Sequence, residues 1–236
     1  KRLILRSASS TDWKNTLFKN ELTQQATANL NLSHQASIPV IVFINGEYWG
    51  LYYLREKIDE HYVENNHNLN SDSIDLMNRN GALCGTDIHF VNTYQMIMNT
   101  DPNSSSFYNL IEERFDLDNY IDYFIVETYI QNRDWYAGYN NIKLWRSQNN
   151  GKWRYILYDT DQTFFEDDPN INYIDLARNP YQVRPNNDTI DRSSMHSELF
   201  DRILMNDEFK CRFIIRYADL VNTIFHPDKF SMKIQE

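Results

Sequence analysis

Two apolar runs separated by a turn signal form the clearest pattern in the first half of the chain. Residues 38–44 read IPVIVFI, residues 47–56 read EYWGLYYLRE, and Asn45-Gly46 stands between them. Both runs are rich in β-branched and aromatic residues, which favour strands. An Asn-Gly pair favours a two-residue turn because both central positions need positive φ. The pattern therefore predicts a β-hairpin over 38–56.

The hairpin is preceded by a predicted helix and a short strand. Residues 1–6, KRLILR, are a strand candidate, and Thr11 or Asp12 can cap a helix that continues to Leu30. Leucine and alanine recur in this segment at roughly helical spacing. We expect one helix between the first strand and the hairpin.

The middle of the chain alternates between polar connectors and helical patterns. Residues 57–86 are Asn-rich and predict a connector with one short strand, SIDLMN. Helices are predicted over 87–99 and 106–114. Asp116 or Asp118 can cap a longer helix through residues 119–132, whose apolar face indicates packing in a core.

The second half contains another predicted hairpin. NIKLWR (141–146) and WRYILYD (153–159) flank the turn SQNNGK. Residues 166–192 appear irregular, with three prolines, and residues 196–225 predict one or two amphipathic helices. No internal repeat is visible.

Composition narrows the class of protein. The chain has 236 residues, of which 42% are hydrophobic and 24% charged, so it can bury a core as one large domain or as two lobes that share a cleft. No apolar run approaches the roughly 18 residues that span a bilayer. The net charge of −10 argues against a duplex nucleic-acid binder. It fits an acidic site that holds cations, or a solubilising surface.

Cysteine and histidine contribute no recognisable metal site. Cys84 and Cys211 are far apart in sequence and are interpreted as two thiols, with a single disulfide as the alternative. The six histidines lack metal-ligand spacing. The chain starts at Lys1 without a leader, so we expect an excised segment with any signal peptide outside it.

The informative stretch for chemistry is 117–164. Asp134 follows the long helix, Asn140 and Asn141 precede the first strand of the second hairpin, and Asp159 ends its second strand. An antiparallel hairpin returns its end beside its start, which places Asp159 next to the two amides. Asp161 lies two residues further and points to the same side if the strand continues. These hard oxygen ligands suit Mg²⁺ or Mn²⁺ and suit zinc or iron poorly.

The same order of elements occurs in a protein-kinase catalytic core. Asn132-Arg133-Asp134 stands where His-Arg-Asp would be, and Asp159-Thr160-Asp161 stands where Asp-Phe-Gly would be. The alternative for each residue taken singly is a plain turn, loop or capping role. The ordered combination favours the kinase interpretation.

Two blocks carry a resemblance to a known family. The hairpin INGEYWGLYYLREKIDEHYV (44–63) and the block NRDWYAGYNNIKLWR with GKWRYILYDTDQTF (132–164) resemble the CotH kinase family, named for a bacterial spore-coat protein. The resemblance implies an α+β, atypical protein-kinase-like fold. It also implies a secreted or surface-associated enzyme that transfers phosphate from ATP to Ser or Thr of extracellular or coat proteins. In that fold, residues 1–56 would form a small upper lobe, incomplete in this chain, and residues 57–236 a mainly helical lower lobe.

The resemblance also implies roles for single residues. Asp134 would be the general base or hydroxyl-orienting group. Asn140, Asn141, Asp159 and Asp161 would hold one or two Mg²⁺ or Mn²⁺ ions.

Three upstream residues are candidates for cofactor binding, each with a structural alternative. Arg6 would contact phosphate or be a surface arginine. Glu21 would orient a lysine that this segment lacks or be a solvated helix charge. Glu56, at the hinge, would contact nucleotide or pair with Arg55 or Lys57.

A second class of function stays open at this point. The chain would then be a catalytically silent kinase-like scaffold or binding domain of a cell-surface or cellulosome-type protein. Its aromatic residues would serve stacking on a polysaccharide or a partner protein, or would simply pack in the core. The candidates for stacking are Tyr48, Trp49, Trp135, Tyr136 and Tyr139.

Overall fold

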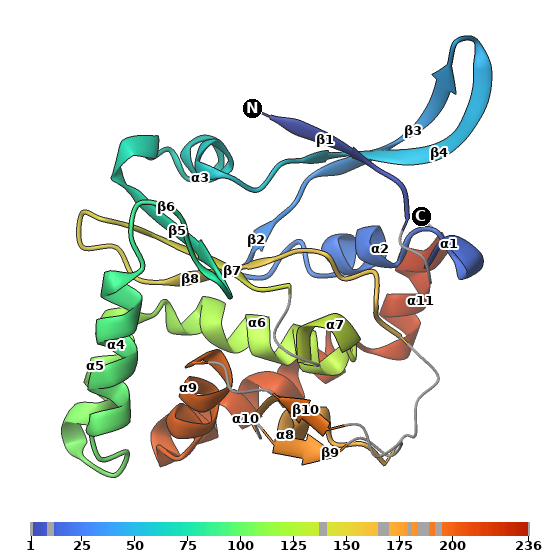
Figure 1. Cartoon of the computed structure of the whole chain (residues 1–236). Helices are drawn as coiled ribbons and strands as arrows, with labels where there is room; N and C mark the ends of the chain where they lie inside the picture. The colour runs from blue at the N-terminus through green and yellow to red at the C-terminus, as the bar shows by residue number, and fades with distance from the viewer. Residues whose placement is uncertain are drawn as a thin grey trace.

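Among the described residues, the fold combines a three-stranded sheet, a five-stranded sheet and a short strand pair with a helical layer, so the mixed α+β class predicted from the sequence is confirmed. The computed structural model describes residues 2–8, 12–136, 141–164, 170–178, 181–183, 189–191 and 195–235. Figure 1 shows the two larger sheets above the longest helices of the core, with the short strand pair at the bottom of the view.

The first hairpin belongs to a three-stranded antiparallel sheet. Its strands are β1 (Leu3–Arg6), β3 (Ser37–Ile44) and β4 (Glu47–Glu56), in the order β1-β4-β3. Asn45 and Gly46 have φ of 53° and 85°, which confirms the predicted turn and its chemistry. The far end of the hairpin projects away from the rest of the chain in Figure 1.

The second hairpin lies inside a five-stranded sheet. It comprises β7 (Lys143–Ser147) and β8 (Arg154–Leu157), as predicted. β5 (Ile74–Asn78) and β6 (Gly81–Cys84) extend the sheet beyond β7, and β2 (Ser33–His34) pairs in parallel with β8 on the other side. The predicted connector 57–86 therefore contains two strands rather than one. It also contains a helix, α3 (Glu60–His67), whose start is capped by Asp59.

The predicted single helix after β1 is wrong, because the chain breaks it into α1 (Asp12–Asn15) and α2 (Lys19–Ala26). Leu17 has φ of 69°, which ends the first helix. The Asp12 carboxylate accepts a hydrogen bond from the Lys19 backbone N–H at 3.1 Å. One aspartate therefore begins the first helix and also satisfies a donor at the start of the second.

The long helix α6 (Leu117–Tyr129) is the centre of the core. It begins at Asp116, whose side chain accepts from the Asn119 N–H, and almost all its residues are buried. The Tyr123 ring stacks on Tyr155 of β8 with centroids 4.6 Å apart, and the Phe124 ring stacks on Phe200 of α9 at 4.1 Å. These contacts fix the helix between the five-stranded sheet and the C-terminal helices.

The remaining elements surround this core. They are η1 (Ser71–Ser73), α4 (Ile88–Asn99), α5 (Ser105–Arg114), α7 (Arg133–Tyr136), α8 (Tyr173–Arg178), β9 (Tyr181–Val183), β10 (Thr189–Asp191), α9 (Met195–Leu204), α10 (Asp207–Asn222) and α11 (Pro227–Gln235). The predicted irregular stretch 166–192 thus includes α8 and a short strand pair, and α11 lies beyond the helices that the pattern predicted. Among the described helices, none is long and apolar enough to cross a membrane. Cys84 and Cys211 are both free thiols.

Asn119 links α6 to the edge of the five-stranded sheet. Its amide oxygen accepts from the Tyr155 N–H at 2.6 Å, and its amide nitrogen donates to the carbonyls of Tyr155 (3.1 Å) and Asn31 (2.9 Å). The residue is fully buried. The side chain therefore completes the hydrogen bonding of β8 where β2 is too short to do so.

Asn119→Ala should lower the free energy of unfolding by about 2–4 kcal/mol, because it leaves buried backbone groups without partners. Urea denaturation would measure the change. Asn222→Ala is the matched control: Asn222 is exposed on α10, and its loss should change stability by less than about 0.5 kcal/mol. Equal effects from the two variants would show that Asn119 does not join the helix to the sheet.

Candidate functional site

The backbone adopts disfavoured conformations in both segments that carry the predicted site. Asp159 (φ 56°) and Phe164 (φ 53°) lie in the turn that follows β8, and Gln131 (φ 57°) lies just after α6. Side chains other than glycine are uncommon in this region, and such conformations collect at functional sites where surrounding contacts hold them. Tertiary contacts therefore set the shape of both segments.

Arg6 of β1 bridges the two aspartates of the turn. Its Nη2 atom lies 2.5 Å from Asp159 Oδ1 and 3.1 Å from Asp161 Oδ2. The aspartate side chains are only 15% and 4% exposed, so both carboxylates are largely removed from water. Two neighbouring carboxylates with little water need a cation between them, and Arg6 supplies it.

The electrostatics of Asp161 reflect this arrangement. Burial raises the pKa of Asp161, the Asp159 carboxylate raises it further, and the Arg6 guanidinium opposes both effects. The carboxyl therefore keeps its proton to a higher pH than a solvated aspartate does. A second cation at this point would act in the same direction as Arg6.

α2 anchors the turn from one side. Asn20 Oδ1 accepts from the Thr160 N–H at 3.0 Å, and Lys19 Nζ donates to the Thr163 carbonyl at 2.8 Å. Asn20 and Lys19 are buried and were missed by the sequence analysis. The sequence offers little indication that Asn20 and Lys19 contact the site, because polar residues on a surface helix are usually solvated.

The C-terminal end of α6 supports the turn from the other side. The Phe164 N–H donates to the Ile130 carbonyl at 3.0 Å. Glu127 is fully buried, and its Oε2 accepts from Asn132 Nδ2 at 2.9 Å. Burial raises the pKa of Glu127 to about 8, the Asn132 hydrogen bond lowers it in part, and the Asp159 charge adds to the rise. Glu127 is therefore a neutral acid at pH 7, and it too was missed by the sequence analysis.

Asp134 lies in a short helix rather than on the expected loop. It is the second residue of α7, and it is exposed. It is two positions after Asn132, a reach of at most about 7 Å along the chain. The position near the end of α6 is as predicted, and the helical geometry is a correction.

The predicted return of the second hairpin to its start is confirmed at Asn141. Its Nδ2 atom donates to the Asp159 carbonyl at 3.3 Å, so the start and the end of the second hairpin lie side by side. Asn140 lies outside the described residues. Asn141 is held beside the aspartate pair by the main chain of Asp159.

Glu21 pairs with an arginine of the three-stranded sheet. Arg55 Nη2 and Nε lie 2.7 and 2.8 Å from Glu21 Oε1, and Ser37 Oγ donates to the same oxygen at 3.2 Å. The Arg55 side chain is 2% exposed. The cation that Glu21 orients is therefore Arg55 of β4, which the sequence analysis considered only as a neighbour of Glu56.

Glu56 is buried at the end of β4. Its carboxylate accepts from the Ala36 N–H at 3.3 Å and from Asn66 Nδ2 at 3.4 Å. These contacts are structural, but their partners are Ala36 and Asn66, whereas the sequence suggests Arg55 or Lys57. Contact between Glu56 and a nucleotide stays a prediction.

The donors at the turn fit a divalent cation bound through oxygen. Asp159 and Asp161 converge on one cationic group, as ligands of a metal ion must. Over the described ranges, no group of three or more His, Cys, Asp or Glu side chains can hold a metal ion. Mg²⁺ is commonly held by one or two carboxylates together with waters and substrate phosphates, which is the set that this turn can complete.

Comparison with known proteins identifies the family. A protein-family model described as CotH kinase protein matches residues 1–236, so the chain belongs to the CotH kinase family. A comparison with curated proteins found no match. The predicted family is confirmed over the whole chain, and the mixed α+β architecture agrees with a kinase-like domain.

Arg6→Gln should lower the free energy of unfolding by about 1.5–3 kcal/mol at neutral pH, the usual contribution of a hydrogen bond to a charged group. The raised pKa of Asp161 keeps its carboxyl protonated near pH 4, where it needs no cation beside it. The loss of stability should therefore be smallest near pH 4 and largest near pH 7. Urea unfolding at the two pH values would test this. The control is Arg2→Gln, because the Arg2 side chain is 51% exposed and its pairs with Asp59 and Glu60 should contribute less than about 1 kcal/mol. A pH-independent loss would contradict the role of Arg6.

Glu127→Gln should remove a pH dependence of folding. The folded-state pKa of Glu127 is about 8 against an ordinary value of 4.5, so its contribution to stability is complete below 4.5 and is lost as the pH rises towards 8. Relative to the variant, the wild type should lose up to about 1.4 kcal/mol per pH unit in that window. Denaturation series would measure it, with exposed Glu113→Gln as the control for removal of a carboxyl. Parallel curves for wild type and Glu127→Gln would refute the buried neutral acid.

Proposed function

We propose that this chain is a protein kinase domain that transfers phosphate from ATP to Ser or Thr residues of extracellular or coat proteins. The observation that carries the proposal is the convergence of Asp159 and Asp161 on Arg6, beside Asn141 and the end of α6. Membership of the CotH kinase family supports the kinase-like class. The protein substrate and the location at the cell surface or outside the cell are part of the proposal.

Asp159 and Asp161 are the residues that would hold Mg²⁺ or Mn²⁺, with Asn141 and Asn140 as further oxygen donors. When bound, the cation supplies charge neutralisation for the phosphates. The buried position of both carboxylates strengthens their electrostatic interaction with any cation. The anchors from α2 and from Ile130 hold the turn in place, so little reorganisation accompanies binding.

Arg6 has two tasks in this proposal. In the protein alone it neutralises the aspartate pair. Its side chain is 36% exposed, so the guanidinium reaches solvent on one side and can contact a phosphate oxygen of ATP there. The buried Glu21–Arg55 pair fixes the three-stranded sheet against α2 and thereby positions β1, which carries Arg6.

Asp134 would orient the acceptor hydroxyl and receive its proton. It is exposed, as a residue that meets a protein substrate must be, and α7 places it after Asn132. Asn132 is buried and is bonded to Glu127, so the start of this segment is rigid.

One observation favours the second candidate function, a silent scaffold that binds polysaccharide or protein. Tyr48 and Trp49 at the far end of the first hairpin are 65% and 60% exposed, so their rings are accessible for stacking. Trp135 is fully buried and cannot take part, which corrects that candidate. Tyr139 and the side chain of Tyr136 lie outside the described residues.

Titration with ATP separates the two functions. With Mg²⁺ or Mn²⁺ present, calorimetry should show nucleotide binding to the chain. Asp159→Asn should abolish cation-dependent binding and labelling of Ser or Thr. Asp134→Asn should keep nucleotide affinity but slow transfer by about 10²–10⁴-fold, the usual contribution of a general base.

The control substitution is Asp228→Asn, a matched change at a side chain that is 90% exposed and far in sequence from the site. It should leave binding and transfer unchanged. If Asp159→Asn and Asp134→Asn both labelled substrate as well as the wild type, transfer would not use this site. Absence of nucleotide binding would favour the scaffold.

A further inference from the structure

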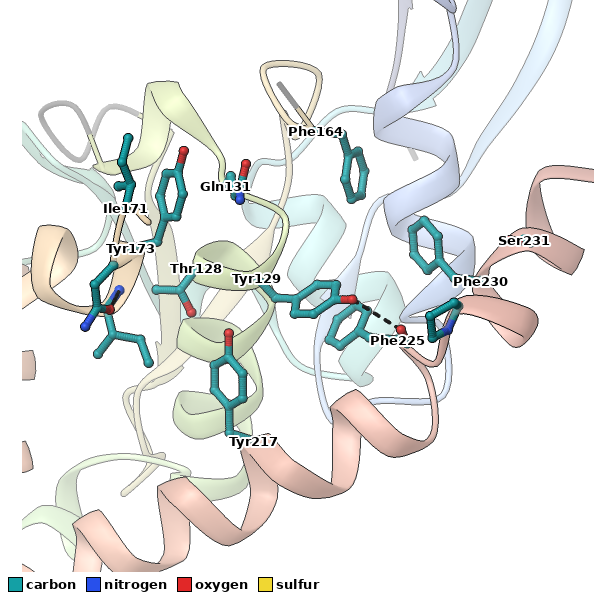
Figure 2. A pocket seen from close by; sticks show the side chains of 13 residues that line it. Thr128, Tyr129, Gln131, Phe164, Ile171, Tyr173, Tyr217, Phe225, Phe230 and Ser231 are labelled. Carbon is teal, nitrogen blue, oxygen red and sulfur yellow. Dashed lines mark hydrogen bonds between the residues drawn. The ribbon is translucent and has the colours of Figure 1, made fainter. Parts of the chain in front are cut away.

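A cavity lined by aromatic rings opens beside the candidate site. Its volume is about 690 Å³, and it lies between the end of α6, α8, α10 and α11. Figure 2 shows tyrosine and phenylalanine rings on its walls, contributed by several elements. The aromatic lining residues are Tyr129, Phe164, Tyr173, Tyr217, Phe225 and Phe230.

Two of the lining residues belong to the segments that carry the site. Gln131 is three residues before Asp134, and Phe164 is three residues after Asp161. Three residues of chain span at most about 11 Å. The cavity wall is therefore within about 11 Å of the backbone of both aspartates, which is three or four residues of an extended peptide.

Ring stacking and a hydrogen bond hold the side chains of the cavity wall in place. The Tyr129 ring stacks on Phe225 with centroids 4.0 Å apart, and its hydroxyl donates to the Phe225 carbonyl at 3.2 Å. The Phe164 ring packs against Phe230 of α11 at 5.5 Å. Figure 2 shows the hydrogen bond from the Tyr129 hydroxyl to the Phe225 carbonyl, and it shows the Phe164 and Phe230 side chains next to each other. A cavity with fixed walls loses little conformational entropy when it is filled.

The side chains that line the cavity determine which kind of ligand it can bind. None of the described lining residues carries a charge, so a phosphate or carboxylate would find no ionic partner there. The rings offer an apolar surface, and the amides of Gln131 and Asn172 add polar groups that suit a peptide main chain. An uncharged, apolar segment of polypeptide satisfies both features.

We propose that this cavity binds an aromatic or branched aliphatic side chain of the acceptor protein, within about four residues of the phosphorylated Ser or Thr. The inference rests on the proposed function, because it places the acceptor hydroxyl at Asp134. It makes the cavity a specificity-determining site for the substrate. Continuity with the candidate site and the absence of charge on the described lining residues are the features that support this occupant.

Ser-centred peptides test the proposal without requiring turnover. Each position from five residues before the serine to five after it is varied among Phe, Leu, Gly and Asp, and binding is measured by fluorescence polarisation with and without Mg²⁺ and ATP. We expect Phe or Leu to bind at least about tenfold more tightly than Gly or Asp at one position, since burial of such a side chain contributes about 1.5–3 kcal/mol.

A pair of neighbouring substitutions shows whether the cavity causes the selection. Ser231 is exposed on α11 and lines the cavity, whereas Met232 is 56% exposed and does not line it. Ser231→Trp should abolish the preference by filling the cavity, and Met232→Trp should preserve it. If the tryptophan variant melts at a lower temperature than wild type, Ser231→Leu with Met232→Leu replaces the pair.

Failure of this inference is distinguishable from failure of the proposed function. Transfer of phosphate to peptides without any apolar preference, or a preference that survives both Ser231 variants, would overturn the inference and leave the kinase proposal standing. An apolar preference that Ser231→Trp removes, without transfer, would support the peptide site and refute the acceptor role. Binding of a fatty acid such as laurate, with no binding of any peptide, would also overturn it.

Discussion

Two largely buried carboxylates on one turn impose the constraint that organises this molecule. Asp159 and Asp161 are separated by a single residue and cannot both ionise in a poorly solvated place without a cation. Arg6 provides that cation from a strand 155 residues away from Asp161 in sequence. This charge interaction therefore fixes the three-stranded sheet over the turn. The site forms only when β1, which carries Arg6, packs against the turn that carries Asp159 and Asp161.

α2 is the element through which this constraint spreads. On one side it bonds to the turn through Lys19 and Asn20, and on another it pairs with Arg55 of β4 through Glu21. Gln24 donates to the Leu157 carbonyl at 2.9 Å and accepts from the Gln35 N–H at 3.1 Å. Four polar residues of one short helix thus bind the five-stranded sheet, the three-stranded sheet and the turn. Such a network is stable because its members satisfy one another away from water.

The parts of the fold that follow from local rules were predictable from the sequence. Asn45-Gly46 determined the first hairpin, and the return of an antiparallel hairpin to its start correctly placed Asn141 beside Asp159. The break at Leu17 and the helix α3 were missed. Asp12 begins the first helix, and its side chain also accepts from the backbone N–H of Lys19 at the start of the second. A single periodicity does not encode such a double role.

The long-range pairs of the site could be predicted only in part. The sequence analysis selected Arg6 and Glu21 because a kinase-like layout needs a phosphate contact and an acidic partner on the following helix. It could not pair Glu21 with Arg55, since no spacing rule joins a helix to a later strand of another hairpin. Glu127 and Asn20 were beyond reach for a related reason: a polar residue on an amphipathic helix is solvated by default, and burial is decided by tertiary packing.

The buried acid at the end of α6 and the aspartates of the turn share one electrostatic environment. The Asp159 charge contributes to the raised pKa of Glu127. A cation that neutralises Asp159 therefore makes the ionisation of Glu127 less costly. By linkage, protonation of Glu127 makes a negative charge on Asp159 less costly. Glu127 also holds Asn132 at 2.9 Å, two residues before Asp134. The neutral form of one buried carboxyl therefore supports both halves of the site: it spares the aspartate pair a third negative charge, and it keeps the segment that leads to Asp134 in place.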